Sequence, residues 1–106
     1  MVIEYIRYKI PVEQQELFLN DYKLASKSLD SSEYCCGYEL THCEEEIEKF
    51  ILRIKWTSTE DHLKKFRQST QFKEFLPYIK PYIPNIEEMQ HYNITEIKSN
   101  YLATNS

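Results

Sequence analysis

A histidine and an arginine stand close together in the stretch KWTSTEDHLKKFRQSTQF, residues 55–72. His62 falls in the first turns of an expected helix, where the helix dipole disfavours an imidazolium. A neutral ring can accept a proton, so His62 is the candidate general base. Arg67 lies about one turn further on and can stabilise an anion. The alternatives are structural: His62 fixes the junction between strand and helix, and Arg67 pairs with an acidic neighbour at a subunit edge.

The chain is rich in aromatic residues, with nine tyrosines and five phenylalanines, which indicates a large interface or an aromatic-lined cavity. Six residues are candidates for the wall of such a cavity: Trp56, Phe66, Phe72, Tyr82, His91 and Tyr92. Trp56 and Phe66 fit a role in the core equally well. His91 and Tyr92 are adjacent on a strand and point to opposite faces, so at most one of them faces the cavity.

Charge and hydropathy exclude several classes of function. The net charge is −4 and the basic residues are scattered, so we expect no nucleic-acid partner. The longest apolar runs are only a few residues, too short to cross a membrane. The start of the chain, MVIEYIRYKI, has the pattern of a strand and not of a signal peptide, so a cytoplasmic location is expected.

Three cysteines, Cys35, Cys36 and Cys43, lie near His42. On one extended strand Cys35 and Cys43 are roughly 26 Å apart at about 3.3 Å per residue, and there is no spaced C-x-x-C pair. We therefore expect half-buried reduced thiols and no metal site.

The hydrophobic periodicity predicts alternating strands and helices. Strands are expected over 2–10, 34–42, 47–56 and 87–97, and a helix over 12–28. A second helix is expected to start at Ser58, with Asp61 as capping partner, Leu63, Phe66 and Thr70 facing inward, and a restart at Ser69. The segment PYIKPYIPNI holds Pro77, Pro81 and Pro84 and is expected to be an ordered aromatic loop, with Tyr82 in a lid over the ligand. Residues 98–106 are expected to be a polar tail.

This order is β-α-β-β-α-β, the ferredoxin-like α+β arrangement, with an antiparallel sheet and both helices on one face. The other face is expected to carry Ile3, Tyr5, Ile47 and Ile51. Because monomers rarely expose such a strip, we expect a homodimer joined sheet to sheet, with Arg7 in a salt bridge across the interface.

The motif WTSTEDHxxxFRxSxxF, from Trp56 to Phe72, resembles the signature of antibiotic biosynthesis monooxygenase (ABM) domains. The closing MQHY, Met89 to Tyr92, resembles the His-Tyr pair on the last strand of that family. The resemblance covers residues 1–95, and we assign the domain to 1–97. It implies a dimeric α+β barrel with a ligand cavity between helices and sheet in each subunit.

For function, the resemblance implies a monooxygenase that acts on a small phenolic or quinol-type aromatic without flavin or metal. A ligand-binding or stress-associated dimer without turnover is the alternative. Haem degradation is disfavoured, because Phe66 and Leu76 stand where the haem-degrading relatives have Trp and His, and the first strand has no Asn.

Overall fold

The computed structural model describes residues 1–99. The elements follow in the order β1 (Val2–Lys9), η1 (Val12–Gln14), α1 (Gln15–Asp30), β2 (Cys35–His42), β3 (Lys49–Trp56), η2 (Asp61–Lys65), η3 (Phe66–Gln68), α2 (Thr70–Ile79), η4 (Lys80–Asn85) and β4 (Ile86–Asn93). The segment η2 is a π-helical turn, and the other η segments are 3₁₀ turns. Most of the expected polar tail, residues 100–106, lies outside the described residues.

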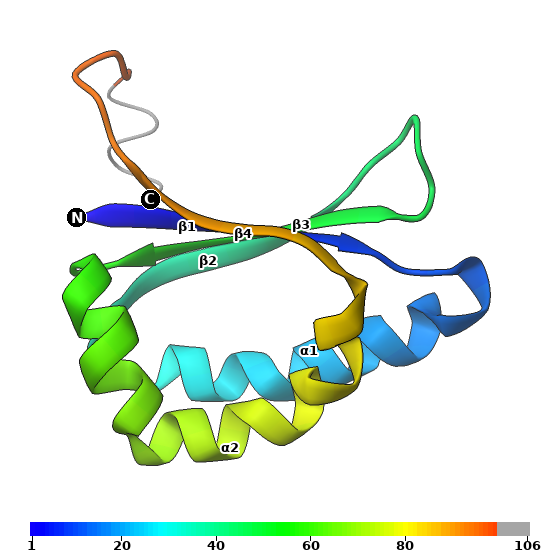
Figure 1. Cartoon of the computed structure of the whole chain (residues 1–106), viewed down its shortest axis with the longest axis horizontal. Coiled ribbons are helices and arrows are strands. Elements are labelled where there is room, and N and C mark those ends of the chain that lie inside the picture. Colours follow the sequence, from blue (N-terminus) through cyan, green and yellow to red (C-terminus); the bar gives the residue numbers. More distant parts are fainter. Residues whose placement is uncertain (100–106) are drawn as a thin grey trace.

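The four strands form one antiparallel sheet in the order β2-β3-β1-β4. Both long helices lie on the same face of this sheet, and among residues 1–99 no helix covers the other face (Figure 1). The predicted ferredoxin-like α+β fold is therefore confirmed. The central strand β1 pairs with β3 on one side and β4 on the other, so its inward side chains lie at the middle of the helix-covered face.

The core lies between this face of the sheet and the two helices. Every second residue of β3 from Phe50 to Trp56 is buried, and β1 contributes Val2, Ile6 and Tyr8. From the helices, α1 supplies Phe18, Tyr22, Ala25 and Leu29, and α2 supplies Phe75 and Ile79. Each element thus turns one apolar stripe inward, as its periodicity predicts.

Gly37, the single glycine of the chain, lies at a bulge in β2. The pairing of β2 with β3 shifts between Cys35 and Gly37, and Gly37 has a φ of 153°. A side chain with a Cβ atom is disfavoured at that angle, so glycine is suited to the position.

Two of the predicted strand boundaries are wrong. The third strand begins at Lys49, and Ile47 lies in the preceding turn, where its carbonyl accepts hydrogen bonds from Gln15 and His42. Ile47 therefore lies in the turn and is not part of the third strand. The last strand ends at Asn93, and Ile97 therefore does not share a face with Met89 and His91.

The proline-rich segment is helical, not an aromatic loop. Pro77 lies within α2, and Pro81 and Pro84 lie in the 3₁₀ turn η4. Pro81 stands at the start of η4, where a backbone N–H has no partner within the helix and proline's fixed φ suits the turn. The chain therefore stays helical through the three prolines, with a change from α-helix to 3₁₀ helix between Ile79 and Lys80.

The outer face of the sheet differs from expectation in two ways. Ile3 is already buried within one chain, and a hollow of about 570 Å³ beside it is lined by Tyr5, Ile51, Ile94 and other residues. Arg7 pairs with Glu88 of the neighbouring strand at 3.1 Å. The arginine that we expected to bridge two subunits thus forms its salt bridge within the chain.

Candidate functional site

A carboxyl group is buried in the helix-covered face of the sheet. Glu4 follows the inward alternation of β1 between Val2 and Ile6, and only 1% of it is exposed. The sequence did not lead us to Glu4, because only the apolar residues of this strand were used to predict its inward face. The signal was present: a single acidic residue at an inward position of a strand has to be paired or functional.

The sheet places two partners beside Glu4. His91 is directly opposite Glu4 in the pairing of β1 with β4, and it is half-buried. Trp56 ends β3 and donates its indole N–H to Glu4 Oε1 at 3.0 Å. The second carboxyl oxygen, Oε2, is buried without a hydrogen-bond partner. A buried polar atom of this kind is rare, and it marks the place where a bound molecule can contribute a bond.

His62 enters the same region from the segment after β3. Ser58 Oγ accepts the N–H of Asp61 at 2.9 Å, which confirms half of the predicted capping box. The carboxylate of Asp61 instead accepts a bond from Thr57 at 2.6 Å.

The following π turn changes part of the inward face that we assigned, although Phe66 is buried as predicted. His62 is only 4% exposed, whereas Leu63 is 39% exposed and Thr70 is also exposed. In η2 the N–H of Phe66 bonds to Asp61, five residues back, so the turn holds more residues than an α-helical turn. The extra residue moves His62 from the edge to the interior. Its ring stacks on Trp56, with centroids 4.3 Å apart and planes at 9°.

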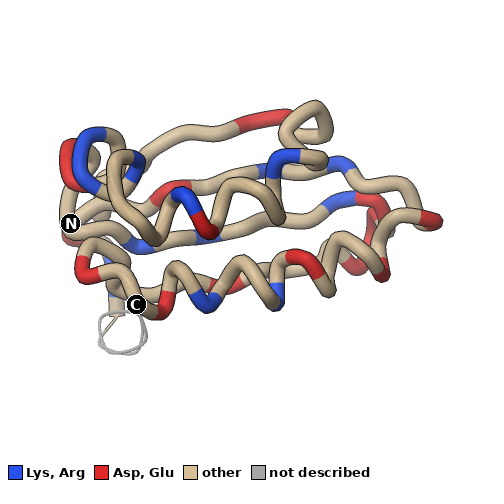
Figure 2. The backbone as a smooth tube through the Cα atoms, turned by 90° about the horizontal axis from the view of Figure 1, so that it is seen from below, with Lys and Arg blue, Asp and Glu red and all other residues tan. Residues whose placement is uncertain are grey.

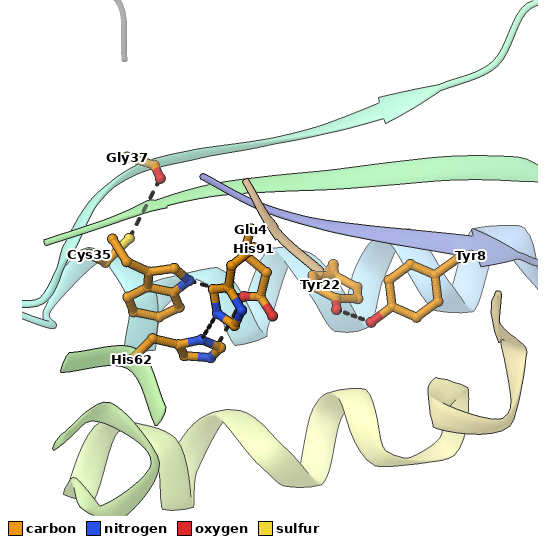
Figure 3. A network of polar contacts seen from close by, with 8 residues as sticks. Glu4, Tyr8, Tyr22, Cys35, Gly37, His62 and His91 are labelled. Carbon is orange, nitrogen blue, oxygen red and sulfur yellow. Dashed lines mark hydrogen bonds and ion pairs between the residues drawn. The ribbon is translucent and has the colours of Figure 1, made fainter. Parts of the chain in front are cut away.

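Both nitrogens of His62 face a titratable neighbour, as Figure 3 shows. Nδ1 lies 2.8 Å from Nε2 of His91, and the two atoms share one hydrogen bond. Nε2 lies 3.6 Å from Oε1 of Glu4. The three side chains therefore form a row from the buried carboxyl through His62 to the half-buried His91.

The electrostatics of this row favour neutral forms. Burial raises the pKa of Glu4 to about 7, although the Trp56 hydrogen bond and the charge of Arg67 oppose the rise. Burial, together with Arg67 and His91, lowers the pKa of His62 to about 3. Burial and Arg67 also lower the pKa of His91. Near neutral pH the carboxyl is the group that exchanges a proton most easily.

A cavity of about 270 Å³ opens beside the carboxyl. Aromatic and aliphatic side chains form most of its wall, including Trp56, Phe66 and Phe72, and the polar groups at the wall are Glu4, His62, Tyr8 and the exposed Arg67. Phe66 packs edge to face on Phe72 with ring centroids 5.6 Å apart. We call Glu4, Trp56, His62, Arg67 and His91, with this cavity, the carboxyl site.

Of the residues that the sequence suggested, six meet here: His62, Arg67, Trp56, Phe66, Phe72 and His91. Two do not. Tyr82 is buried in the core, where its ring packs on Phe18 and its hydroxyl donates to Asp21. Tyr92 lies on the outer face of the sheet against Tyr5, so only His91 of the adjacent pair lies on the helix-covered face, where it bonds to His62.

Arg67 has no hydrogen bond or ion pair with another of the described residues 1–99, so the acidic neighbour that we considered is not found within the chain. Its charge nevertheless acts on Glu4, His62 and His91, which lowers the pKa of each. The guanidinium is therefore free to meet an anion in the cavity.

Within residues 1–99, the candidate ligand atoms of Glu4, His62 and His91 lie within 4.8 Å of one another. This spacing is compatible with a metal ion. The shortest approaches use different nitrogens of His62, with His91 at 2.8 Å from Nδ1 and Glu4 at 3.6 Å from Nε2. The cysteines take no part: Cys35, Cys36 and Cys43 are half-buried free thiols, as predicted.

The surface carries interspersed charges. Basic and acidic residues alternate along the backbone without a large region of one sign (Figure 2). Within the described part of the chain, no helix has the length and apolar character to cross a membrane.

Comparisons with known proteins agree with the resemblance of the motif. The family model "Antibiotic biosynthesis monooxygenase" (ABM) matches residues 1–78. The uncharacterized protein YczJ of Bacillus subtilis (strain 168) is 23% identical over 92 residues, which are 87% of this chain and 97% of that protein.

Solved structures share the fold. A candidate antibiotic biosynthesis monooxygenase from Bordetella bronchiseptica superposes with a TM-score of 0.71 at 20% identity, over 89% of this chain and 96% of the other. Rv0793 from Mycobacterium tuberculosis gives 0.72 at 13% identity, over 92% and 98%. With its signature motif and the matched family model, the chain belongs to the antibiotic biosynthesis monooxygenase family.

Proposed function

We propose that the protein is a monooxygenase that adds an oxygen atom from O₂ to a small phenolic or quinol-type aromatic bound in the carboxyl site. One observation carries the proposal: the unpartnered Oε2 of Glu4 lies at an apolar, aromatic-walled cavity beside the unpaired cation Arg67. A phenol fits this combination, because its ring matches the walls and its hydroxyl supplies the missing hydrogen bond.

The chemistry needs little from the protein. An electron-rich aromatic that has lost a proton can itself pass an electron to O₂, so the site has to hold the ring, take up the proton and stabilise the anion. Arg67 is suited to the last task, since a guanidinium next to a forming phenolate lowers its energy in a site of low dielectric. His62 and the residues bonded to it are suited to handling the proton. No flavin or metal is required by this scheme.

The size of the cavity limits the substrate class. A volume of about 270 Å³ suits a compound of one or two fused rings and is small for haem. Two residues of the cavity wall also disfavour haem degradation. Phe66 and Leu76 stand where the haem-degrading relatives are expected to have Trp and His.

The test combines binding with oxygen consumption. Thermal shifts are measured with a panel of quinols, flavonoid-like phenols and haem, and each hit is then assayed in an oxygen electrode. A ligand at 100 times its Kd raises the stability by about 2.7 kcal/mol. Arg67→Gln should weaken binding of the ionised form and turnover, whereas His42→Gln, on the far side of the core from the site, should change neither. Binding of a phenol without oxygen consumption would support the non-catalytic binding protein instead.

We further propose that two copies join through the open sheet face. Tyr92, Ile94 and Ile97 remain exposed around the hollow on that face, which is more apolar surface than an isolated domain usually leaves in one place. The interface should bury on the order of 2,000 Å² or more in total. Light scattering that finds only a 12.9 kDa species at micromolar concentration contradicts the dimer, and Ile51→Glu should dissociate it.

A reducing compartment such as the cytoplasm is the proposed location. The support is chemical: all three thiols are free, and Cys35 and Cys36 are adjacent without being paired to any partner. Fractionation of the producing cells tests the proposal, and recovery of the protein outside the cytoplasm would contradict it.

A further inference from the structure

We propose that Glu4 is the group that takes the ligand's proton, and that His62 and His91 carry this proton between the ligand-filled cavity and solvent. The inference rests on the proposed function and assigns its proton path. It differs from the motif-based expectation, in which His62 alone is the base.

The nitrogens of His62 and the second oxygen of Glu4 differ in their partners. Nδ1 of His62 shares a hydrogen bond with His91 at 2.8 Å, and Nε2 faces Oε1 of Glu4 at 3.6 Å. Oε2 of Glu4, in contrast, is buried and has no partner. A hydroxyl in the cavity that donates to Oε2 supplies the missing hydrogen bond of the carboxyl, and the carboxyl in turn lies beside the imidazole.

Burial decreases from Glu4 through His62 to His91, which gives a path for the proton toward solvent. Glu4 is buried, His62 is almost fully buried, and His91 is half-buried on the edge strand β4. Once an aromatic ligand fills the cavity, water has no direct way to Glu4. The row of imidazoles then offers the remaining connection between the carboxyl and solvent. Figure 3 shows His62 and His91 side by side next to the carboxyl.

The transfer balances in three steps. The ligand's O–H bond breaks, the proton bonds to Oε2 of Glu4, and the electron pair stays on the ligand as a phenolate beside Arg67. The carboxyl then turns about its last torsion, which is soft and two-fold, so that the protonated oxygen faces Nε2 of His62. Nε2 gains this proton while Nδ1 gives its own to Nε2 of His91, and His91 releases a proton to water. The reverse steps return a proton when the oxygen adduct breaks down to product and water.

The electrostatics agree with a concerted transfer. The groups that face Glu4 are Trp56 on β3, His62 on η2, Arg67 on η3 and His91 on β4; Tyr8 and Tyr22 lie further along the core, and α2 offers only apolar side chains to the cavity. An imidazolium at His62 is disfavoured, since burial, Arg67 and His91 lower its pKa to about 3. A proton passing His62 must therefore enter one nitrogen as another leaves, and the 2.8 Å bond to His91 permits this. The gap of 3.6 Å to Glu4 is of the kind that closes in a ligand complex.

The experiment has one arm that depends on turnover. With the best quinol of the panel, Glu4→Gln should lower the rate of oxygen consumption by a factor on the order of 10² or more. His91→Gln keeps a hydrogen-bonding side chain but cannot relay a proton. It should lose part of the rate, and added imidazole should restore it. His42→Gln is the matched control and should be neither slower nor sensitive to imidazole.

A second arm does not need turnover and uses 4-nitrophenol, whose yellow colour reports its ionised form. Wild-type protein should bind it partly as the phenolate, and Glu4→Gln should bind it only as the neutral phenol. Equal ionisation in the two proteins overturns the role of Glu4. Full activity of Glu4→Gln or His91→Gln in an active wild-type background overturns the relay and leaves the oxygenase intact. An inactive wild type that ionises 4-nitrophenol through Glu4 overturns the oxygenase and supports the role of Glu4. A stoichiometric metal ion that is lost in Glu4→Gln also overturns the relay.

Discussion

Two buried clusters with polar groups occupy the same layer of the molecule, between the sheet and the two helices, and they are built differently. At one end lies the tyrosine cluster (Tyr8, Phe18, Tyr22, Phe50 and Tyr82), and at the other lies the carboxyl site. Figure 3 shows the contact of Tyr8 with Tyr22 and the contacts of Glu4, His62 and His91. The hydroxyls of Tyr8 and Tyr22 bond to each other, and Tyr82 bonds to Asp21. In the carboxyl site one oxygen of Glu4 stays without a partner.

The difference indicates where the fold is optimised for stability and where it is not. Burial raises the pKa of Tyr8 to about 12 and raises that of Tyr22 further above its ordinary value, so both remain neutral at any physiological pH. Their bond is a fixed part of the core. Glu4 has a pKa of about 7, so its charge changes within the physiological range. A group that is costly to bury and easy to titrate is typical of a functional site.

The largest effect is expected from breaking the tyrosine cluster. Phe18→Ala should cost about 3–5 kcal/mol of the free energy of unfolding, because Phe18 is fully buried and packs against four aromatic rings. Phe72→Ala, at the half-buried wall of the cavity, is the matched variant and should cost clearly less. Urea unfolding measures both, and equal losses would mean that the two ends do not differ in packing.

A second prediction concerns the pH dependence of stability. The pKa of Glu4 rises from 4.5 to about 7 on folding, so its contribution is present below 4.5 and is lost as the pH rises through 7. The pKa of His62 falls from 6.5 to about 3, so its contribution is present above 6.5 and is lost as the pH falls toward 3. Between 4.5 and 6.5 the two slopes oppose each other, each at most about 1.4 kcal/mol per pH unit.

Removing the carboxyl should expose the slope of His62. In Glu4→Gln, the free energy of unfolding should rise with pH across this interval. In the wild type, the opposing contributions of Glu4 and His62 should keep it nearly constant. Chemical denaturation at several pH values measures the difference between the two proteins. Parallel pH profiles would show that Glu4 and His62 do not titrate as described.

A third prediction contrasts the polar groups themselves. Tyr22→Phe leaves the buried hydroxyl of Tyr8 without its partner and should cost about 1–3 kcal/mol. Glu4→Gln at pH 8 keeps an acceptor for Trp56 and removes a buried charge, so it should cost nothing or stabilise the protein. Thermal unfolding compares them, and a similar loss in both variants would make Glu4 a structural residue.

The smallest effect is expected on the outer face. Glu39→Gln breaks the 3.0 Å ion pair with Arg53. Because the Glu39 side chain is largely exposed, the change should alter the free energy of unfolding by less than about 1 kcal/mol. If this change also dissociates a dimer in light scattering, the pair lies at the subunit interface and its effect on stability will depend on protein concentration.

The sequence predicted the fold well because the fold depends on periodicity. The alternation in β3 and the helical spacing of Phe18, Tyr22, Ala25 and Leu29 are local signals, and both were confirmed. Boundaries were less certain, since they depend on contacts distant in sequence. The turn at Ile47 is held by Gln15, 32 residues away, and no pattern near Ile47 announces that bond.

The site was only half predictable. The motif indicated His62, Arg67, Trp56 and Phe66 as site residues. The π turn that moves His62 inward has no periodicity of its own in the sequence, so it was not predicted. The pairing of Glu4 with His91 depends on the register of β1 against β4, which follows from the whole sheet. A search for a charged residue within the inward alternation of β1 would have found Glu4.

The most direct test of the account is the titration of Glu4 in the protein without ligand. Infrared difference spectra between wild type and Glu4→Gln, recorded across pH, isolate the band of the protonated carboxyl. The account predicts that this band disappears with a midpoint near pH 7, in accord with the buried environment of Glu4. A midpoint near the ordinary value of 4.5, or no such band at any pH, would contradict the claim that Glu4 exchanges a proton at neutral pH.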